Sequence, residues 1–91
     1  MSIRHYNITV KGKVQRVSYR VWAQGKAMQL NLTGLVKNLA NGDVYIEAEG
    51  EEENINQLIT WCYVGSPLSK VSEVISEEAP VKDMPTFELK R

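Results

Sequence analysis

The chain has 91 residues, of which 43% are apolar and 24% charged, with a formal net charge of zero. This composition is typical of one small globular domain, which we expect to span residues 1–91, and it excludes a disordered or collagen-like chain. No apolar run approaches the ~20 residues of a membrane span, the first residues lack the apolar block of a signal peptide, and the single cysteine, Cys62, cannot form an internal disulfide. We therefore expect a soluble, cytoplasmic protein with no membrane contact, and nothing in the sequence requires more than a monomer.

The zero net charge hides an asymmetry between the two parts of the chain. Residues 1–38 contain seven basic residues and no Asp or Glu, whereas residues 39–91 contain four basic and eleven acidic residues. A segment without carboxylates indicates an anion-binding surface, but the two parts can also simply neutralise each other across the fold. Nucleic-acid binding is a further alternative, although the chain lacks the paired strand aromatics of RNA-binding sheets, and we expect no nucleic-acid partner.

The first predicted element is a strand over residues 6–14, in which apolar and polar residues alternate. A loop over residues 12–18 follows, and apolar residues at intervals of three and four then predict a helix over about residues 20–30. Ser18 is in position to cap that helix. His5 precedes the strand, and we interpret it as a surface histidine.

A hairpin is predicted next, with strands over residues 35–39 and 43–49. Asn41 and Gly42 lie between them, and this dipeptide is the strongest short hairpin signal because both residues tolerate the positive φ of a type I′ turn.

A second helix begins at the acidic run 51–53, where negative charge complements the helix dipole. Its inward face is formed by Ile55, Leu58, Ile59 and Cys62. The helix ends at residues 65–67, which read Gly-Ser-Pro. We interpret Cys62 as a core residue and both Trp22 and Trp61 as packing residues, with Trp22 partly at a pocket rim.

Two further strands close the chain, over residues 70–77 and 86–90. The order is therefore βαββαβ with a short extra C-terminal strand. This predicts an α+β fold of the ferredoxin-like type, a sandwich with a mostly antiparallel sheet and two helices on one face. The architecture hosts many functions, so it decides none.

Several chemistries lack the residues they need. One histidine and one cysteine cannot form a His/Cys metal cluster, and His5 has no partner for a nucleophilic triad. The loop before the first helix remains, because a helix N-terminus presents free backbone N–H groups that bind phosphate-sized anions. Arg20 at the start of that helix fits a bidentate phosphate contact, although an ordinary surface ion pair explains it equally well.

Residues 10–20 read VKGKVQRVSYR, which closely resembles the first signature of the acylphosphatase family, V-x-G-x-V-Q-G-V-x-F-R. Residues 34–50, which include Gly34-Leu35-Val36-Lys37-Asn38 and Asn41-Gly42-Asp43-Val44 and end at Gly50, resemble the second, G-[aromatic]-V-x-N-x-x-x-G-x-V-x-x-x-x-x-G. Residues 65–67 before the strand at 70–71 also resemble the family's helix-to-strand passage. The resemblance covers nearly the whole chain.

The chain departs from the family pattern at three positions. Arg16 stands where the family has glycine, and a left-handed backbone there would cost a non-glycine residue about 1 kcal/mol. Arg16 either crowds the phosphate loop or adds a second cation over the phosphate. Tyr19 replaces phenylalanine, and Leu35 replaces an aromatic residue.

The resemblance implies metal-independent hydrolysis of acyl phosphates to a carboxylate and inorganic phosphate, with no cofactor. It implies that the loop from residue 12 to 19 binds phosphate through backbone amides, that Arg20 is the essential phosphate-binding arginine, and that Asn38 positions the attacking water. The phosphate-binding residues are thus expected to be Gln15, Arg16, Val17, Ser18, Tyr19 and Arg20. We expect a phosphate or sulfate-like anion to bind in the loop. The alternative is a non-catalytic anion-binding or interaction module on the same fold, with its loop altered by Arg16.

Overall fold

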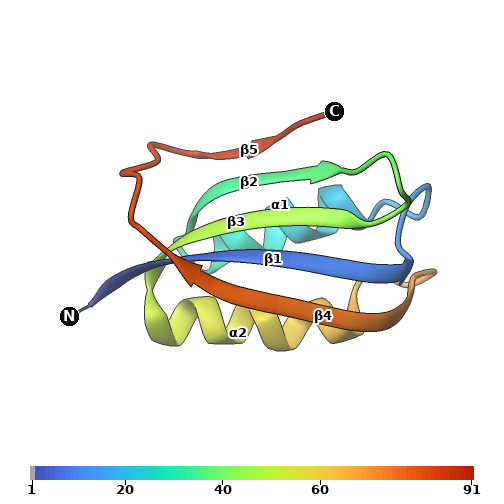
Figure 1. Cartoon of the computed structure of the whole chain (residues 1–91), viewed down its shortest axis with the longest axis horizontal. Coiled ribbons are helices and arrows are strands. Elements are labelled where there is room, and N and C mark those ends of the chain that lie inside the picture. Colours follow the sequence, from blue (N-terminus) through green and yellow to red (C-terminus); the bar gives the residue numbers. More distant parts are fainter. Residues whose placement is uncertain (1) are drawn as a thin grey trace.

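The computed structural model describes residues 2–91, which form one five-stranded sheet with two helices on one of its faces (Figure 1). In chain order the elements are β1 (Ile3–Lys13), α1 (Tyr19–Gln29), β2 (Thr33–Asn38), β3 (Val44–Glu51), α2 (Glu52–Val64), β4 (Lys70–Ala79) and β5 (Phe87–Leu89). The strand order is β4-β1-β3-β2-β5, and every neighbouring pair is antiparallel except β2 and β5. The predicted ferredoxin-like βαββαβ sandwich with its short last strand is confirmed.

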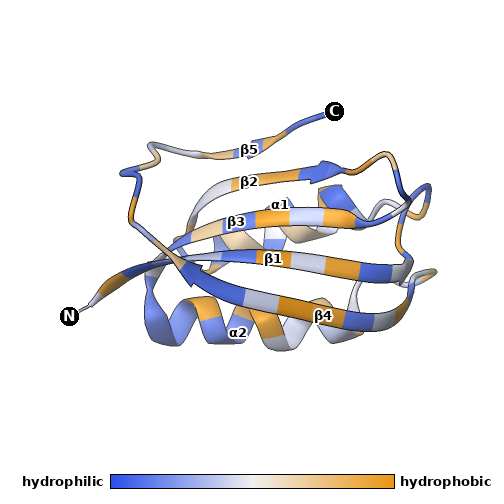
Figure 2. Cartoon of the chain, viewed as in Figure 1, coloured by the Kyte–Doolittle hydropathy of each residue, from blue (hydrophilic) through white to orange (hydrophobic). Residues whose placement is uncertain are grey.

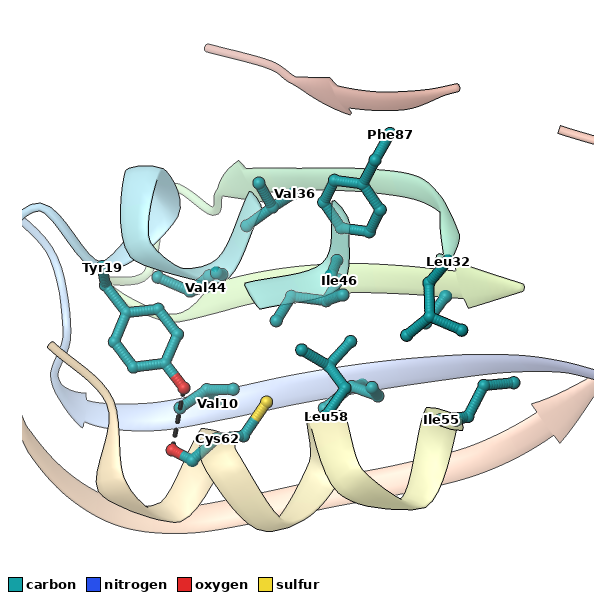
Figure 3. Close-up of a cluster of buried hydrophobic side chains, with 14 of the residues drawn as sticks. Val10, Tyr19, Leu32, Val36, Val44, Ile46, Ile55, Leu58, Cys62 and Phe87 are labelled. Carbon is teal, nitrogen blue, oxygen red and sulfur yellow. Dashed lines mark hydrogen bonds between the residues drawn. The ribbon is translucent and has the colours of Figure 1, made fainter. Parts of the chain in front are cut away.

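The core lies between the sheet and the two helices. Alternate residues of β1, such as Ile8 and Val10, are fully buried against the helix layer, and a similar alternation of apolar and polar positions runs along β3 (Figure 2). Tyr19 at the start of α1 spans this layer, and its hydroxyl donates a 2.8 Å hydrogen bond to the carbonyl of Cys62 on α2 (Figure 3). Cys62 is a buried core residue, as predicted, and burial raises the pKa of its thiol to about 12.

The first helix lies within one residue of its predicted bounds, but its start differs from the prediction. Ser18 occupies the N-cap position with a φ of 61° and makes no side-chain capping bond. Its carbonyl instead accepts a 3.1 Å bond from the backbone N–H of Trp22. The prediction of a serine cap was wrong because the preceding loop turns Ser18 into a left-handed conformation, whereas a capping residue is typically extended.

The hairpin between β2 and β3 forms at the predicted place with a different turn. Gly42 has a φ of 100°, whereas Asn41 is not among the residues with positive φ. The backbone N–H of Gly42 bonds to Leu39 O at 3.2 Å, and the N–H of Leu39 bonds to Asp43 O at 2.8 Å. Three residues therefore form the loop, and the tight two-residue type I′ turn was the wrong prediction.

A polar cluster lies on the sheet face away from the helices, near the start of β1. His5 is fully buried there, and its Nδ1 and Nε2 lie 2.8 Å and 3.2 Å from carboxylate oxygens of Glu49 and Glu47. Glu49 also accepts backbone N–H bonds from Lys82 at 2.6 Å and Met84 at 2.8 Å. The segment between β4 and β5 thus crosses the open sheet face and covers His5, so its interpretation as a surface histidine was wrong.

Three connections meet at the opposite end of the sheet (Figure 1). They are the β1–α1 loop at residues 14–18, the β2–β3 hairpin at residues 39–43 and the α2–β4 connection at residues 65–69. The C-terminus after β5 also runs toward this end. Within residues 2–91, no helix is long and apolar enough to cross a membrane.

Candidate active site

A cavity of about 330 Å³ lies where the β1–α1 loop meets the end of β2. We call it the loop cavity, and it is lined by Val14, Arg16, Ser18, Tyr19, Arg20, Val21 and Asn38. Five of the seven site residues predicted from the sequence therefore come together here. Val14 lies within the loop at residues 12–19 that was expected to bind phosphate, but it was not named as a contact residue. Val21 was not predicted, because an apolar residue beside a polar motif gives no signal of its own.

The backbone of the loop has the geometry of an anion-binding concavity. Arg16 and Ser18 have φ values of 63° and 61°, whereas Val17 between them is not in the positive-φ region. Left-handed residues in a tight loop can turn nearby N–H groups toward one point. The backbone N–H groups from Gln15 to Val21 have no carbonyl partner among residues 2–91, so they remain available as donors.

Two side chains hold the loop from outside the cavity. Gln15 donates through Nε2 to the carbonyls of Leu39 at 2.8 Å and Asp43 at 2.9 Å, which ties the loop to the β2–β3 hairpin. Ser66, after α2, donates from Oγ to the carbonyl of Val17 at 2.7 Å. The side chains of Gln15 and Val17 do not line the loop cavity, but their backbone N–H groups belong to the same loop.

Gly12 allows β1 to turn into this loop beside β4. The register between β1 and β4 shifts after Lys11, and Gly12 has a φ of 125°. A Cβ atom at Gly12 would meet the carbonyl oxygen of Lys70 on β4, so only glycine permits this close approach.

Arg20, in the first turn of α1, is held by the C-terminal segment. Its Nη1 donates to the carbonyl of Lys90 at 2.5 Å, and the backbone N–H of Lys90 in turn bonds to Val36 O on β2 at 2.8 Å. A guanidinium has five donors in a planar fork, so one contact to the backbone leaves others for a ligand in the loop cavity.

Asn38, the last residue of β2, supplies an acceptor with no partner. Its Oδ1 is buried and makes no hydrogen bond to any atom of residues 2–91. Most buried polar atoms are paired, and an exception at a cavity is typical of a group kept for a ligand or water. Because Oδ1 accepts while the amide nitrogen donates, Asn38 can hold a water molecule through its oxygen.

The charge around the loop cavity is positive. Neither Arg16 nor Arg20 forms an ion pair within residues 2–91, whereas Lys11 on β1 pairs with Asp43 at 2.7 Å. The charge asymmetry of the sequence is thus only partly neutralised across the fold. At the loop cavity, two permanent cations face a loop of free N–H donors, an arrangement that suits a phosphate group.

Comparisons with known proteins agree with one another. A model of the acylphosphatase family matches residues 6–89. Among curated relatives, the acylphosphatase of Marinobacter nauticus is 44% identical over 80 residues, which are 88% of this chain and 87% of that protein. The acylphosphatase of Aliivibrio fischeri is 36% identical over 98% of this chain and 99% of its own length.

Solved structures give the same result for the fold. A structure of an acylphosphatase from Coxiella burnetii superposes with a TM-score of 0.94 at 42% identity, covering 97% of this chain and 93% of that one. The crystal structure of the acylphosphatase from Bacillus subtilis also has a TM-score of 0.94, at 33% identity, and covers 99% of this chain and 100% of that one.

Proposed function

Since this chain belongs to the acylphosphatase family and is an enzyme that hydrolyses the carboxyl–phosphate bond of acyl phosphates, we propose that the loop cavity is its catalytic site. One observation carries the proposal. Asn38, whose buried Oδ1 has no partner within residues 2–91, lines the same cavity as Arg20 and the loop whose N–H groups are free.

The loop binds the phosphoryl group of the substrate in this proposal. Backbone N–H groups from Gln15 to Arg20 surround the phosphoryl oxygens, and the guanidinium of Arg20 donates to two of them. Arg16 adds a second positive charge at the mouth of the cavity. These donors are fixed before the substrate arrives, and such preorganised donors lower a barrier most where charge develops in the transition state.

Asn38 positions the attacking water from the sheet side of the loop cavity. The water oxygen forms a bond to phosphorus while the bond from phosphorus to the acyl oxygen breaks, and the electron pair leaves with the carboxylate. A proton of the water passes to a phosphoryl oxygen, so the products are a carboxylate and dihydrogen phosphate. A carboxylate is a good leaving group, so the reaction needs little beyond positioning and charge stabilisation.

The test is hydrolysis of benzoyl phosphate in the presence of excess EDTA. We expect the wild-type chain to hydrolyse benzoyl phosphate at the same rate with and without EDTA. We expect Arg20→Ala and Asn38→Ala to lose at least ~100-fold in kcat/KM, as removal of one preorganised donor does elsewhere. The matched controls are Arg4→Ala, which removes an arginine paired with Glu78 at 2.7 Å, and Asn56→Ala on the exposed side of α2.

Three results would contradict the proposal. Unchanged activity in either site variant would remove that residue from the site, and equal losses in the controls would indicate a general effect on folding. A wild-type chain that is inert until Arg16→Gly is introduced would favour the non-catalytic anion-binding module instead.

We also propose that residues 1–91 act as one monomeric domain in the cytoplasm. The unpaired, buried Cys62 fits a reducing compartment. Light scattering after size exclusion should give the mass of one chain, and a dimer that dissociates only with loss of activity would contradict this.

A further inference from the structure

A second hollow runs along the outer side of α1, next to the loop cavity. It has a volume of about 460 Å³ and is lined by Val21, Trp22, Gly25, Lys26, Gln29 and Trp61. We call it the α1 groove. Val21 lines both the α1 groove and the loop cavity, so the two adjoin at the first turn of α1.

The α1 groove presents apolar side chains that the core does not use. Val21 is 60% exposed and Trp22 is 51% exposed, so Trp22 lines a pocket, as predicted, but is packed less than the sequence indicated. Trp61 forms the opposite wall, and its ring centroid lies 5.3 Å from that of Tyr19, which lines the loop cavity. Gly25 forms the floor, and a Cβ atom added there would meet nothing within 4 Å.

The chemistry of the reaction fits an acyl group in this groove. In an in-line displacement the water and the leaving group lie on opposite sides of phosphorus. Asn38 belongs to the sheet, whereas Val21 belongs to the helix layer. With the water held at Asn38, the carboxylate that leaves would therefore depart along the α1 side, toward Val21.

The length of the groove suits an occupant of moderate size and, within residues 2–91, Lys26 is the one charged residue that lines it. Between Val21 and Gln29 it follows α1 for about 12 Å, which gives room for an acyl chain of about eight carbons. Beyond Lys26 and Trp61 the surface continues into a hollow of about 710 Å³ that Glu52 and Glu53 line, so it becomes acidic.

We propose that the α1 groove binds the acyl group of the substrate, so that the enzyme favours acyl phosphates with an apolar chain or ring over acetyl phosphate. This inference rests on the proposed function of the loop cavity. Each methylene moved from water into a fully apolar site strengthens binding by about fourfold. Because this groove stays open on one side, the gain per carbon is smaller.

The experiment measures kcat and KM for acetyl, butyryl and octanoyl phosphate. We expect KM to fall by at least about tenfold from acetyl to octanoyl phosphate while kcat changes little. Gly25→Leu places a side chain over the turn that holds Val21 and Trp22, so it should remove most of this preference. Trp22→Ala should do the same, with acetyl phosphate hydrolysis within twofold of wild type in both.

Two control variants separate the groove from the helix. Gly25→Ala adds only a Cβ atom at the same position, and Met28→Ala shortens an exposed residue of α1 that lies outside the groove. Both should keep the chain-length preference. A KM that does not depend on chain length, or a preference that survives Gly25→Leu, would overturn the proposal.

A binding measurement keeps this test separate from the test of catalysis. In Trp61→Phe, Trp22 is the remaining indole of the chain. Octanoylphosphonate, which cannot be hydrolysed, should shift its fluorescence emission to the blue, whereas acetylphosphonate should not. A shift in a chain without hydrolytic activity would support the groove while the catalytic proposal fails. No shift with either compound would overturn the groove proposal. A wild-type dimer that Gly25→Leu converts to a monomer would also overturn it, because the occupant of the groove would then be a second copy of the chain.

Discussion

The two ends of the sheet differ in whether their buried polar groups have partners. Near the start of β1, all four carboxylate oxygens of Glu47 and Glu49 have partners, supplied by His5, Tyr45, and the segment at residues 82–84. At the loop cavity, Asn38 Oδ1 has no partner within residues 2–91, and the N–H groups from Gln15 to Val21 have no carbonyl partner there.

We interpret this difference as one between polar groups that hold the fold and polar groups that are left free for a ligand. A buried polar atom without a partner costs about 1–3 kcal/mol, and left-handed residues such as Arg16 and Ser18 cost of order 1–3 kcal/mol each. The rest of the fold offsets these costs at the loop cavity. At the far end the oxygens of the buried carboxylates are all partnered, because the charged groups satisfy one another, although Asp83 there also has a left-handed φ of 57°.

The largest expected effect separates activity from stability at Asn38. Asn38→Leu replaces the unpartnered acceptor by an apolar side chain of similar size, so kcat/KM should fall by at least ~100-fold. The free energy of unfolding should stay the same or rise by about 1 kcal/mol, because no intramolecular hydrogen bond is lost. Benzoyl phosphate hydrolysis and urea unfolding measure the two quantities. A variant that loses both activity and stability would show that Asn38 holds the fold.

The opposite outcome is expected at Glu49. Glu49→Gln removes the charge that accepts N–H bonds from Lys82 and Met84 and contacts His5, so the free energy of unfolding should fall by about 1–3 kcal/mol. Since the loop cavity lies at the other end of the sheet, kcat/KM at 25 °C should stay within twofold of wild type. A large loss of activity in a folded Glu49→Gln chain would break the separation between the two ends.

We also expect the Glu49 carboxyl to make the stability of the fold depend on pH. Burial alone would raise the pKa of this carboxyl, but the N–H bonds from Lys82 and Met84 and the contact with His5 outweigh burial and lower the pKa. A group whose pKa is lower in the folded state stabilises it above the unfolded pKa of about 4.3, and this contribution is lost as pH falls through the folded pKa. Urea unfolding between pH 7 and pH 3 should therefore show a smaller loss of stability in Glu49→Gln than in wild type. Equal slopes would contradict this.

The smallest expected effect is at Arg16. Because its φ of 63° lies in the left-handed region, Arg16→Gly should raise the free energy of unfolding by about 1 kcal/mol. The same change removes a cation from the loop cavity, so KM for benzoyl phosphate should rise while kcat changes less. Thermal unfolding and steady-state kinetics check the two parts. An Arg16→Gly chain with lower stability would mean that the guanidinium supports the loop through contacts of its own.

Local sequence pattern predicted most of the fold. The alternation of apolar residues placed β1 and β3, and the acidic run at residues 51–53 placed the start of α2, because each signal depends only on near neighbours. The features that sequence alone misjudged depend on distant segments. His5 is buried by a segment more than seventy residues later in the chain, and no pattern around His5 could indicate that cover.

The candidate site was predicted mainly through the two signature motifs. These identified Arg20 and Asn38, which the structure brings to one cavity. The motifs could not indicate that the side chain of Gln15 bonds to the hairpin, or that the carbonyl of Lys90 accepts a hydrogen bond from Arg20. Both contacts join parts of the chain that only the fold brings together. The position of Val21 between the loop cavity and the α1 groove was also missed, because an exposed valine on a helix has no distinctive spacing.

The most direct test of the account is a titration of the wild-type chain with inorganic phosphate, followed by backbone amide chemical shifts. We predict large, saturable shifts for the N–H groups of residues 15–21, with Asn38 affected and with residues 47–49 and 82–84 unmoved. The same titration of Arg20→Ala should show weaker binding at the same amides. Shifts centred on the His5 cluster, or no saturable shift in residues 15–21, would contradict the claim that the unpartnered end of the sheet is the phosphate site.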